Sequence, residues 1–242
     1  MFYPPPPLPL APPPPPAYLA LTLPPSAVHT VDTTEGLRLL LAHFRDSCYR
    51  ECTSTPRVMG IDAEWSCAPR RGELRLQWVQ LASEERVFLL DVPALCNGHA
   101  EALHGTLGEL LAAPHVLKVG FGLRGDVAEL RAAHPALAEC AAAVSPVLEL
   151  RDEWKRARAA GRGRAAPATA AGGRPAKPAP RKGAGSLGLS TLCEQMLGAP
   201  LDKRMQLSNW ARRPLVPQQR AYAALDAHCL VLLHAAFGRC DN

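Results

Sequence analysis

Three apolar segments that follow one another through short connections constrain the fold of this chain more than any other feature. Residues 57–65 form a short apolar run that ends in polar residues, as a buried strand does. Residues 73–83 alternate apolar with polar side chains, and residues 86–92 are a third strand candidate. Because the connections are short, we expect these segments to pair as an antiparallel meander.

Helices and strands alternate along the rest of the chain. Residues 28–48 predict a short strand and then a helix, with Thr33 or Thr34 as its cap and Glu35 in its first turn. Beyond the meander we expect helices in residues 100–113, 125–134, 188–197 and 220–237, and strands in residues 115–121 and 146–150. Together these elements predict an α/β fold, a mixed sheet with helices on both faces.

Prolines divide the chain into an arm and a domain. Twelve of the 25 prolines lie in the first 25 residues. Since proline lacks a backbone donor and fixes φ, we expect residues 1–27 to be a disordered or polyproline II arm. The arm is either a spacer or a ligand for a proline-recognising domain. Residues 28–242 are the expected folded domain, with 48% hydrophobic residues in the chain to supply its core.

Positive charge is concentrated in one segment of that domain. Nine basic residues and no acidic residue lie between Trp154 and Cys193. The other 18 basic residues face 22 acidic residues, so the rest of the chain is acidic overall. Residues 157–185 are also rich in Ala, Gly and Pro, which predicts a flexible basic insert. Such an insert is either a nucleic-acid contact without sequence preference, a solvated linker or a localisation signal.

Cysteine usage and the N-terminus indicate an intracellular protein. The eight cysteines form no C-x-x-C pair and several lie in apolar segments, as reduced buried thiols do. A zinc site at Cys48 and Cys52 is the alternative. The N-terminus has no basic region before an apolar core, and no apolar run approaches the roughly 20 residues of a membrane span. We therefore expect a nuclear or cytoplasmic protein without a membrane partner.

Four carboxylates occur at the ends of expected elements or on the last helix. Asp62 and Glu64 end the first meander strand two positions apart, so both side chains face one side of the sheet. Asp126 opens a helix after a strand, and Asp226 follows Tyr222 by one helical turn. Each position alone has a structural explanation, such as a helix cap. Together, four oxygen donors without His or Cys suit Mg²⁺ or Mn²⁺.

At these motifs the sequence resembles a known family. The segments VMGIDAEW, LKVGFGLRGDVAEL and YAALDA are similar to the three exonuclease motifs of the DEDD superfamily of 3′–5′ exonucleases. Tyr222 before Asp226, with Ala221 where the other subclass has histidine, resembles the tyrosine subclass. The chain is similar to animal exonuclease 3′–5′ domain-containing proteins, including relatives of the Mut-type silencing nuclease, and to the exonuclease domain of Werner-type helicases.

The resemblance implies a ribonuclease H-like fold and a two-metal 3′–5′ exonuclease that releases nucleoside monophosphates from nucleic-acid 3′ ends. It implies that Asp62, Glu64, Asp126 and Asp226 hold two divalent ions, Mg²⁺ or Mn²⁺, with Asp62 bridging both. It also implies that Tyr222 orients the attacking water, because a tyrosine with a pKa near 10 is a poor base at neutral pH.

Three further residues are weaker candidates for substrate binding. Trp65 either stacks on the terminal base or packs in the core. Lys203 and Arg213 either contact the phosphate backbone or belong to a solvated face. No motif marks a contact to a 2′-hydroxyl, so single-stranded RNA and DNA are equally compatible substrates. A catalytically weak nucleic-acid-binding scaffold and a proline-rich interaction protein are the alternatives to an enzyme.

Overall fold

A six-stranded mixed sheet lies at the centre of the protein, in the strand order β1-β4-β3-β2-β5-β6. The computed structural model describes residues 17–50, 56–67, 74–133, 135–159 and 188–240. The strands in this part of the chain are β1 (Val28–Val31), β2 (Arg57–Cys67), β3 (Leu74–Ala82), β4 (Val87–Asp91), β5 (Val116–Gly120) and β6 (Val147–Glu149). The helices are η1 (Pro25–Ala27), α1 (Thr34–Arg50), α2 (Val92–Gly98), α3 (Ala100–Ala112), α4 (Leu123–Ala133), α5 (Pro135–Ala142), α6 (Leu150–Ala159), α7 (Leu189–Leu197) and α8 (Pro217–Cys240).

Strands β2, β3 and β4 form the antiparallel meander that the sequence predicts. Across β2 and β3, Asp62 pairs with Gln80 and Glu64 pairs with Trp78. Strand β5 lies parallel to β2, β6 lies parallel to β5, and β1 lies parallel to β4. The predicted mixed α/β sheet is therefore confirmed.

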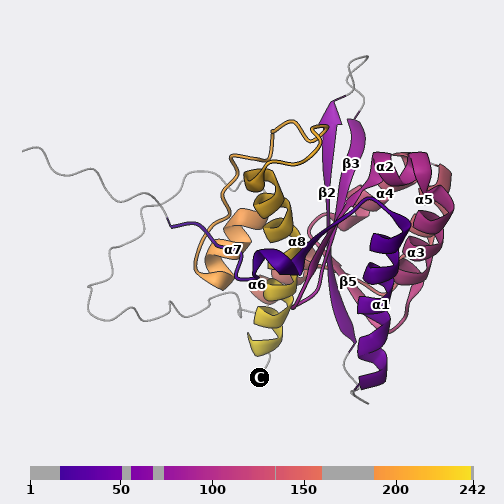
Figure 1. Ribbon diagram of the computed structural model, residues 1–242. Helices are drawn as coiled ribbons and strands as arrows, with labels where there is room; N and C mark the ends of the chain where they lie inside the picture. Colours follow the sequence, from indigo (N-terminus) through magenta and orange to yellow (C-terminus); the bar gives the residue numbers. More distant parts are fainter. Residues whose placement is uncertain (1–16, 51–55, 68–73, 134, 160–187, 241–242) are drawn as a thin grey trace, which may run out of the picture.

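Helices cover both faces of the sheet (Figure 1). On one face, α1, α3, α4 and α5 pack over a core that includes Leu40 and Leu107. On the other face, α6, α7 and α8 enclose a second core that includes Leu192 and Leu233. Both faces of the sheet thus carry a hydrophobic core and a layer of helices, as predicted.

Helix α8 packs directly on the sheet. Ala223, Ala224 and Ala227 are fully buried there, and their small side chains allow a close approach. A Cβ atom at Gly60 of β2 would lie 2.3 Å from the carbonyl oxygen of Ala227, so this contact requires glycine. Residues 217–238 have the length and mean hydropathy of a membrane span, but 67% of that window is buried inside the protein, as in the core helix of a globular domain.

Three α-helices, α2, α5 and α6, and the short helix η1 were not predicted. Helix α6 continues to Ala159, three residues into the segment expected to be a flexible insert. Its first turn carries Asp152 and Glu153 and its last turn carries Arg156 and Arg158, a distribution that favours the helix dipole. Residues 160–187, which make up most of the predicted insert, lie outside the described residues.

The chain packs against the domain before the predicted boundary at residue 28. The backbone N–H of Leu19 donates to the carbonyl of Pro200 at 2.9 Å. Leu19, Leu21 and Leu23 also pack against the cores on the α8 side of the sheet. The arm expected over residues 1–27 is therefore not disordered along its whole length, because its leucine-rich end has apolar surface to bury. Residues 1–16 lie outside the described residues.

Candidate active site

Strand β2 and helix α8 bring three carboxylates together on one face of the sheet. Ligand oxygen atoms of Asp62, Glu64 and Asp226 all lie within 4.8 Å of one another. Asp62 and Glu64 share a face because they are two positions apart on β2. Asp226 reaches them because α8 touches β2 at Gly60 and Ala227, next to the carboxylates on both elements.

Tyr222 lies one turn before Asp226 on α8, at the spacing that the sequence predicts. Its hydroxyl donates a hydrogen bond to the Asp226 carboxylate. Its ring packs against Trp210, with 5.9 Å between the ring centroids. Tyr222 is thus held from both sides and faces the same cleft as the carboxylates.

Asp126 occupies the first turn of α4, which follows β5 through a tight turn. Gly122 in this turn has a φ of 92°, a conformation that favours glycine. Its N–H donates to the Glu149 carboxylate at 2.7 Å, so the end of β6 holds the turn in place. Asp126 lines the same cleft as the other three carboxylates. The volume of this cleft is about 780 Å³.

The carboxylates strongly perturb one another. Burial, and then the charges of Asp226 and Asp126, raise the pKa of Asp62 well above its usual range. Burial and the neighbouring carboxylates, Asp62 first among them, raise the pKa of Glu64 to about 10. Asp226 is 6% exposed and Glu64 is 8% exposed, so water does little to screen this repulsion.

The outer members of the cluster are perturbed less. Burial and the charge of Glu149 raise the pKa of Asp126 to about 6. Burial raises the pKa of Asp226 to about 6, although the hydrogen bond from Tyr222 and the charge of Lys203 oppose the rise. Burial and the Asp226 carboxylate raise the pKa of Tyr222, so its hydroxyl keeps its proton at neutral pH.

This donor set fits a hard divalent cation. Four carboxylates supply only oxygen atoms, which are the ligands that Mg²⁺ and Mn²⁺ prefer. Their mutual repulsion is relieved when a cation binds between them, because an opposite charge favours the ionised form of each carboxyl group. The residues present therefore match the metal ions that the sequence resemblance implies.

Two of the three weaker candidates, Trp65 and Lys203, line the cleft. A β-bulge between Glu64 and Trp65 changes the direction of the strand. Trp65 consequently lines the cleft while also packing against the core beneath α1 and α3. Lys203 lies close enough to Asp226 for its charge to act on that carboxylate. Both positions suit contact with a substrate that enters the cleft.

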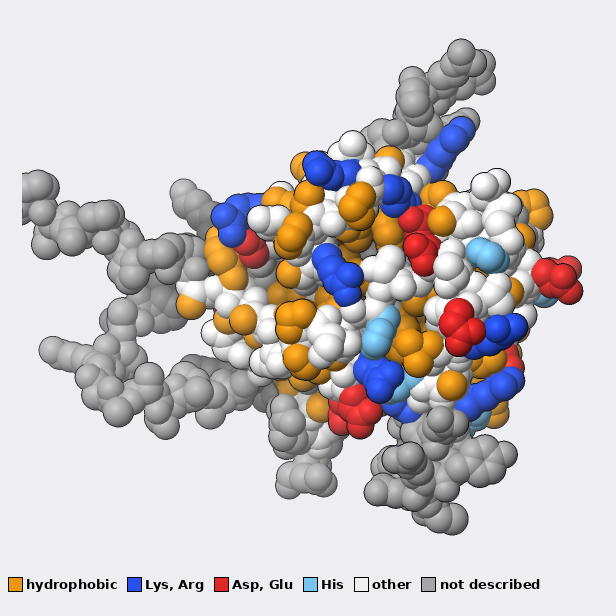
Figure 2. Space-filling model, viewed as in Figure 1, with side chains coloured by type: hydrophobic (Ala, Val, Ile, Leu, Met, Phe, Trp, Pro, Cys, Tyr) orange, Lys and Arg blue, Asp and Glu red, His pale blue; other side chains and the backbone are white. Residues whose placement is uncertain are grey.

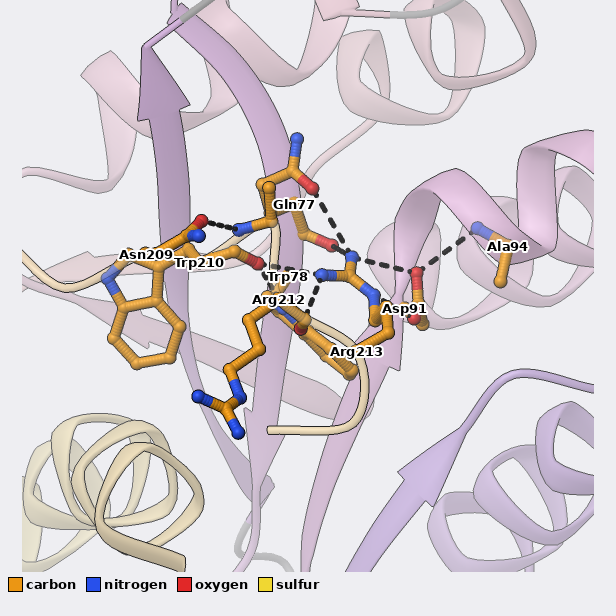
Figure 3. Close-up of polar contacts among 9 residues, drawn as sticks. Gln77, Trp78, Asp91, Ala94, Asn209, Trp210, Arg212 and Arg213 are labelled. Carbon is orange, nitrogen blue, oxygen red and sulfur yellow. Dashed lines mark hydrogen bonds and ion pairs between the residues drawn. The ribbon is translucent and has the colours of Figure 1, made fainter. Parts of the chain in front are cut away.

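Arg213, the third candidate, does not line the cleft. Its guanidinium forms an ion pair with Asp91, lies 4.3 Å from the centroid of the Trp78 ring, and donates to the Trp210 carbonyl at 2.7 Å. Figure 3 shows these contacts converging on Arg213 between β3 and β4. The predicted phosphate contact at this position is therefore replaced by an internal one, because Arg213 already has a nearly buried acidic partner.

Part of the cleft wall was missed by sequence reasoning. Phe121, Ser190 and residues 206–209 also line the cleft. Residues 206–209 belong to the segment LDKRMQLSNWARRPL, in which no spacing or motif indicates which side chains face the site.

Comparisons with known proteins identify the family of this chain. A family model described as 3′-5′ exonuclease matches residues 28–239. The exonuclease mut-7 homolog of Homo sapiens is 34% identical over 227 residues, which are 92% of this chain and 24% of that relative. This chain thus spans about a quarter of the length of that protein.

Solved structures share the fold. The Aedes aegypti Nibbler EXO domain has a TM-score of 0.72 and 24% identity, with 92% of each chain covered. Trypanosoma brucei RNase D in complex with RNA U12 has a TM-score of 0.58 and 23% identity, covering 87% of this chain and 62% of that one. With its motifs in one cleft and a family model that covers nearly the whole described domain, this chain belongs to the 3′-5′ exonuclease family of the DEDD superfamily.

Proposed function

We propose that this chain hydrolyses the terminal phosphodiester bond at the 3′ end of single-stranded RNA or DNA and releases nucleoside monophosphates. The observation that carries the proposal is the convergence of Asp62, Glu64, Asp126 and Asp226 with Tyr222 in one cleft. A scaffold that only binds nucleic acid has no need for a cluster of mutually repelling carboxylates. Such a cluster also repels the phosphate backbone unless cations neutralise it.

The four carboxylates would hold two divalent ions, Mg²⁺ or Mn²⁺. When bound, the ions would supply activation of a water molecule and neutralise charge that develops on the scissile phosphate. Tyr222 would orient that water by accepting a hydrogen bond from it at the phenolic oxygen, since the one Tyr222 proton is retained at neutral pH and is donated to Asp226. Lys203 would contact a phosphate, and Trp65 would contact the terminal base.

Surface charge supports the approach of a polyanion. On the face seen in Figure 2, Lys and Arg side chains gather along the upper edge, where β2, β3 and the loop before α8 lie in Figure 1. Contacts of this kind bind without sequence preference and weaken as salt is added. We therefore expect the nuclease to accept many sequences.

The proposed setting is intracellular, in the nucleus or cytoplasm. Cys96, Cys193 and Cys229 are free thiols in the described part of the chain, and the last two are buried. Reduced cysteines are typical of nuclear and cytosolic proteins. A fusion of this chain to a fluorescent protein, imaged in living cells, tests the location.

Cleavage of 5′-labelled single-stranded RNA and DNA tests the activity. Each strand is incubated with Mg²⁺, Mn²⁺ or EDTA and with wild type or the isosteric double variant Asp62→Asn, Glu64→Gln. Glu35→Gln is the control, because Glu35 is an exposed carboxylate on α1 that pairs only with Arg38 among the described residues. The proposal expects a ladder that shortens from the 3′ end in wild type and control, and no ladder with EDTA or the double variant. Strands that are bound but never shortened would leave a scaffold as the function.

A further inference from the structure

Leu207 is the most exposed large apolar side chain in the described part of the chain, at 96%. Single exposed leucines are common on protein surfaces, so exposure alone indicates nothing. Leu207, however, lines the same cleft as Asp62, Asp126 and Asp226. An apolar side chain almost fully in water at the edge of a charged cleft has surface to bury when a ligand enters.

The loop around Leu207 is built from successive turns. The backbone N–H of Gln206 donates to the carbonyl of Lys203 at 3.1 Å. The N–H of Ser208 donates to the carbonyl of Met205 at 2.9 Å. These two overlapping turns fix the backbone on either side of Leu207 and leave its side chain directed to solvent.

Side chains from α8 and the next turn anchor the same residues. The indole N–H of Trp210 donates to the carbonyl of Gln206 at 3.3 Å. The side-chain amide of Gln219 donates to the hydroxyl of Ser208 at 3.0 Å. Both neighbours of Leu207 are thus tied to a larger structure, which fixes the backbone from which the leucine side chain projects.

The anchor itself is fastened to the sheet. The indole N–H of Trp78 donates to the carbonyl of Trp210 at 3.0 Å, and Arg213 donates to the same carbonyl (Figure 3). Trp210 is 1% exposed. Leu207 is therefore held in water at the cleft by a rigid support that reaches the central strands, an arrangement that favours recognition over packing.

We propose that Leu207 is a specificity-determining residue, an apolar platform for the nucleobase upstream of the scissile phosphate. The proposal rests on the proposed exonuclease function. The 3′-terminal nucleotide has no continuation, so it occupies the depth of the cleft beside the carboxylates, and the rest of the strand leaves past the exposed edge where Leu207 lies. Every base has an apolar face, so such a contact selects nucleic-acid strands without selecting sequence.

Leu207→Ala tests the platform when two substrates are compared. One is a single-stranded oligonucleotide, and the other is the methyl ester of thymidine 5′-monophosphate, which has the scissile phosphate but no upstream base. A base that packs on Leu207 removes part of the leucine side chain from water, so we expect kcat/KM for the oligonucleotide to fall about five- to tenfold more than for the ester, through KM. Leu207→Met should restore most of the loss. Leu39→Ala, which removes another exposed leucine on α1, is the control.

An oligonucleotide with an abasic site at the upstream position completes a double-mutant cycle. For wild type, the missing base should weaken binding by the same factor as Leu207→Ala does on the intact strand. When both changes are combined, the loss of affinity should be no larger than the loss from either change alone. Equal losses on both substrates, no loss, or fully additive losses would each refute the platform. The same cycle is measured as Kd in the Asp62→Asn background, so it decides the matter even if wild type cleaves nothing and the proposed function fails.

Discussion

Replacing Arg213 with alanine should destabilise the fold without removing a phosphate contact. The change strands the carboxylate of Asp91, which is 5% exposed and keeps only the Ala94 N–H as a donor among its described contacts, at 3.1 Å. It also removes the hydrogen bond to the Trp210 carbonyl and the stacking on Trp78. The structure thus makes Arg213 a support for the loop that carries Leu207.

The expected loss of unfolding free energy is about 3–4 kcal/mol. Removing one partner of a buried ion pair typically costs about 3–5 kcal/mol. The Arg213 side chain is 31% exposed, so water can reach Asp91 once the guanidinium is gone, which favours the lower end of that range. The lost cation–π contact adds about 0.5–1 kcal/mol. Arg213→Lys keeps the charge but loses the paired geometry of the guanidinium, so it should lie between alanine and wild type.

Urea unfolding followed by tryptophan fluorescence measures this loss, since Trp78 and Trp210 both lie at the site. Arg212→Ala is the matched control, because Figure 3 draws no contact from the Arg212 guanidinium, and it should change the stability by no more than about 0.5 kcal/mol. A phosphate contact predicts the opposite pattern, unchanged stability with a shallower dependence of strand binding on salt. That pattern for Arg213→Ala, or a loss no larger than in the control, would refute the structural role.

Three further outcomes are expected. Gly60→Ala should lower the free energy of unfolding by at least about 1–3 kcal/mol and lower cleavage, because the new Cβ would lie 2.3 Å from the Ala227 carbonyl oxygen. Gly105→Ala is the control: Gly105 is a helical position with open space, so this change should raise the free energy of unfolding by about 0.5–1 kcal/mol in the same denaturation assay. Burial lowers the pKa of Lys118 to about 8. Between pH 8 and 10.5 Lys118 is therefore protonated in the unfolded chain and neutral in the folded one, so the free energy of unfolding should rise with pH by up to about 3 kcal/mol. Lys118→Met should abolish this rise in thermal melts across that range. Asp62→Asn should raise the melting temperature in EDTA, because it removes a carboxyl group that burial and the neighbouring carboxylates keep from ionising, and should reduce the stabilisation by Mn²⁺; a lower melting temperature in EDTA would contradict this destabilisation.

Local spacing predicted the parts of the site that lie within single elements. The i, i+2 relation of Asp62 and Glu64 and the i, i+4 relation of Tyr222 and Asp226 follow from strand and helix geometry alone. The meander followed in the same way from alternation and short connections. These relations survive folding because neither depends on which elements become neighbours.

Contacts between distant segments were beyond that reasoning. Arg213 pairs with Asp91, which lies 122 positions away in the sequence. Because this partner could not be recognised from the sequence, Arg213 was interpreted as a phosphate ligand. Gly60 showed no special role until α8 was seen to touch β2 there. Helix α5 was missed because its alanine-rich sequence has few large apolar residues to mark a face.

Docking of α8 would be coupled to the proposed metal binding through Asp226. Folding brings Asp226 from the last helix against Asp62 and Glu64 from the first meander strand, and their charges oppose that approach. Burial of α8 side chains such as Leu233 offsets the repulsion in the absence of metal. A divalent ion held by these carboxylates would favour the docked helix, and by reciprocity a helix that docks less well would bind the ion less tightly. Gly60→Ala alters no carboxylate, so a weaker metal affinity in that variant would come from the packing of α8 alone.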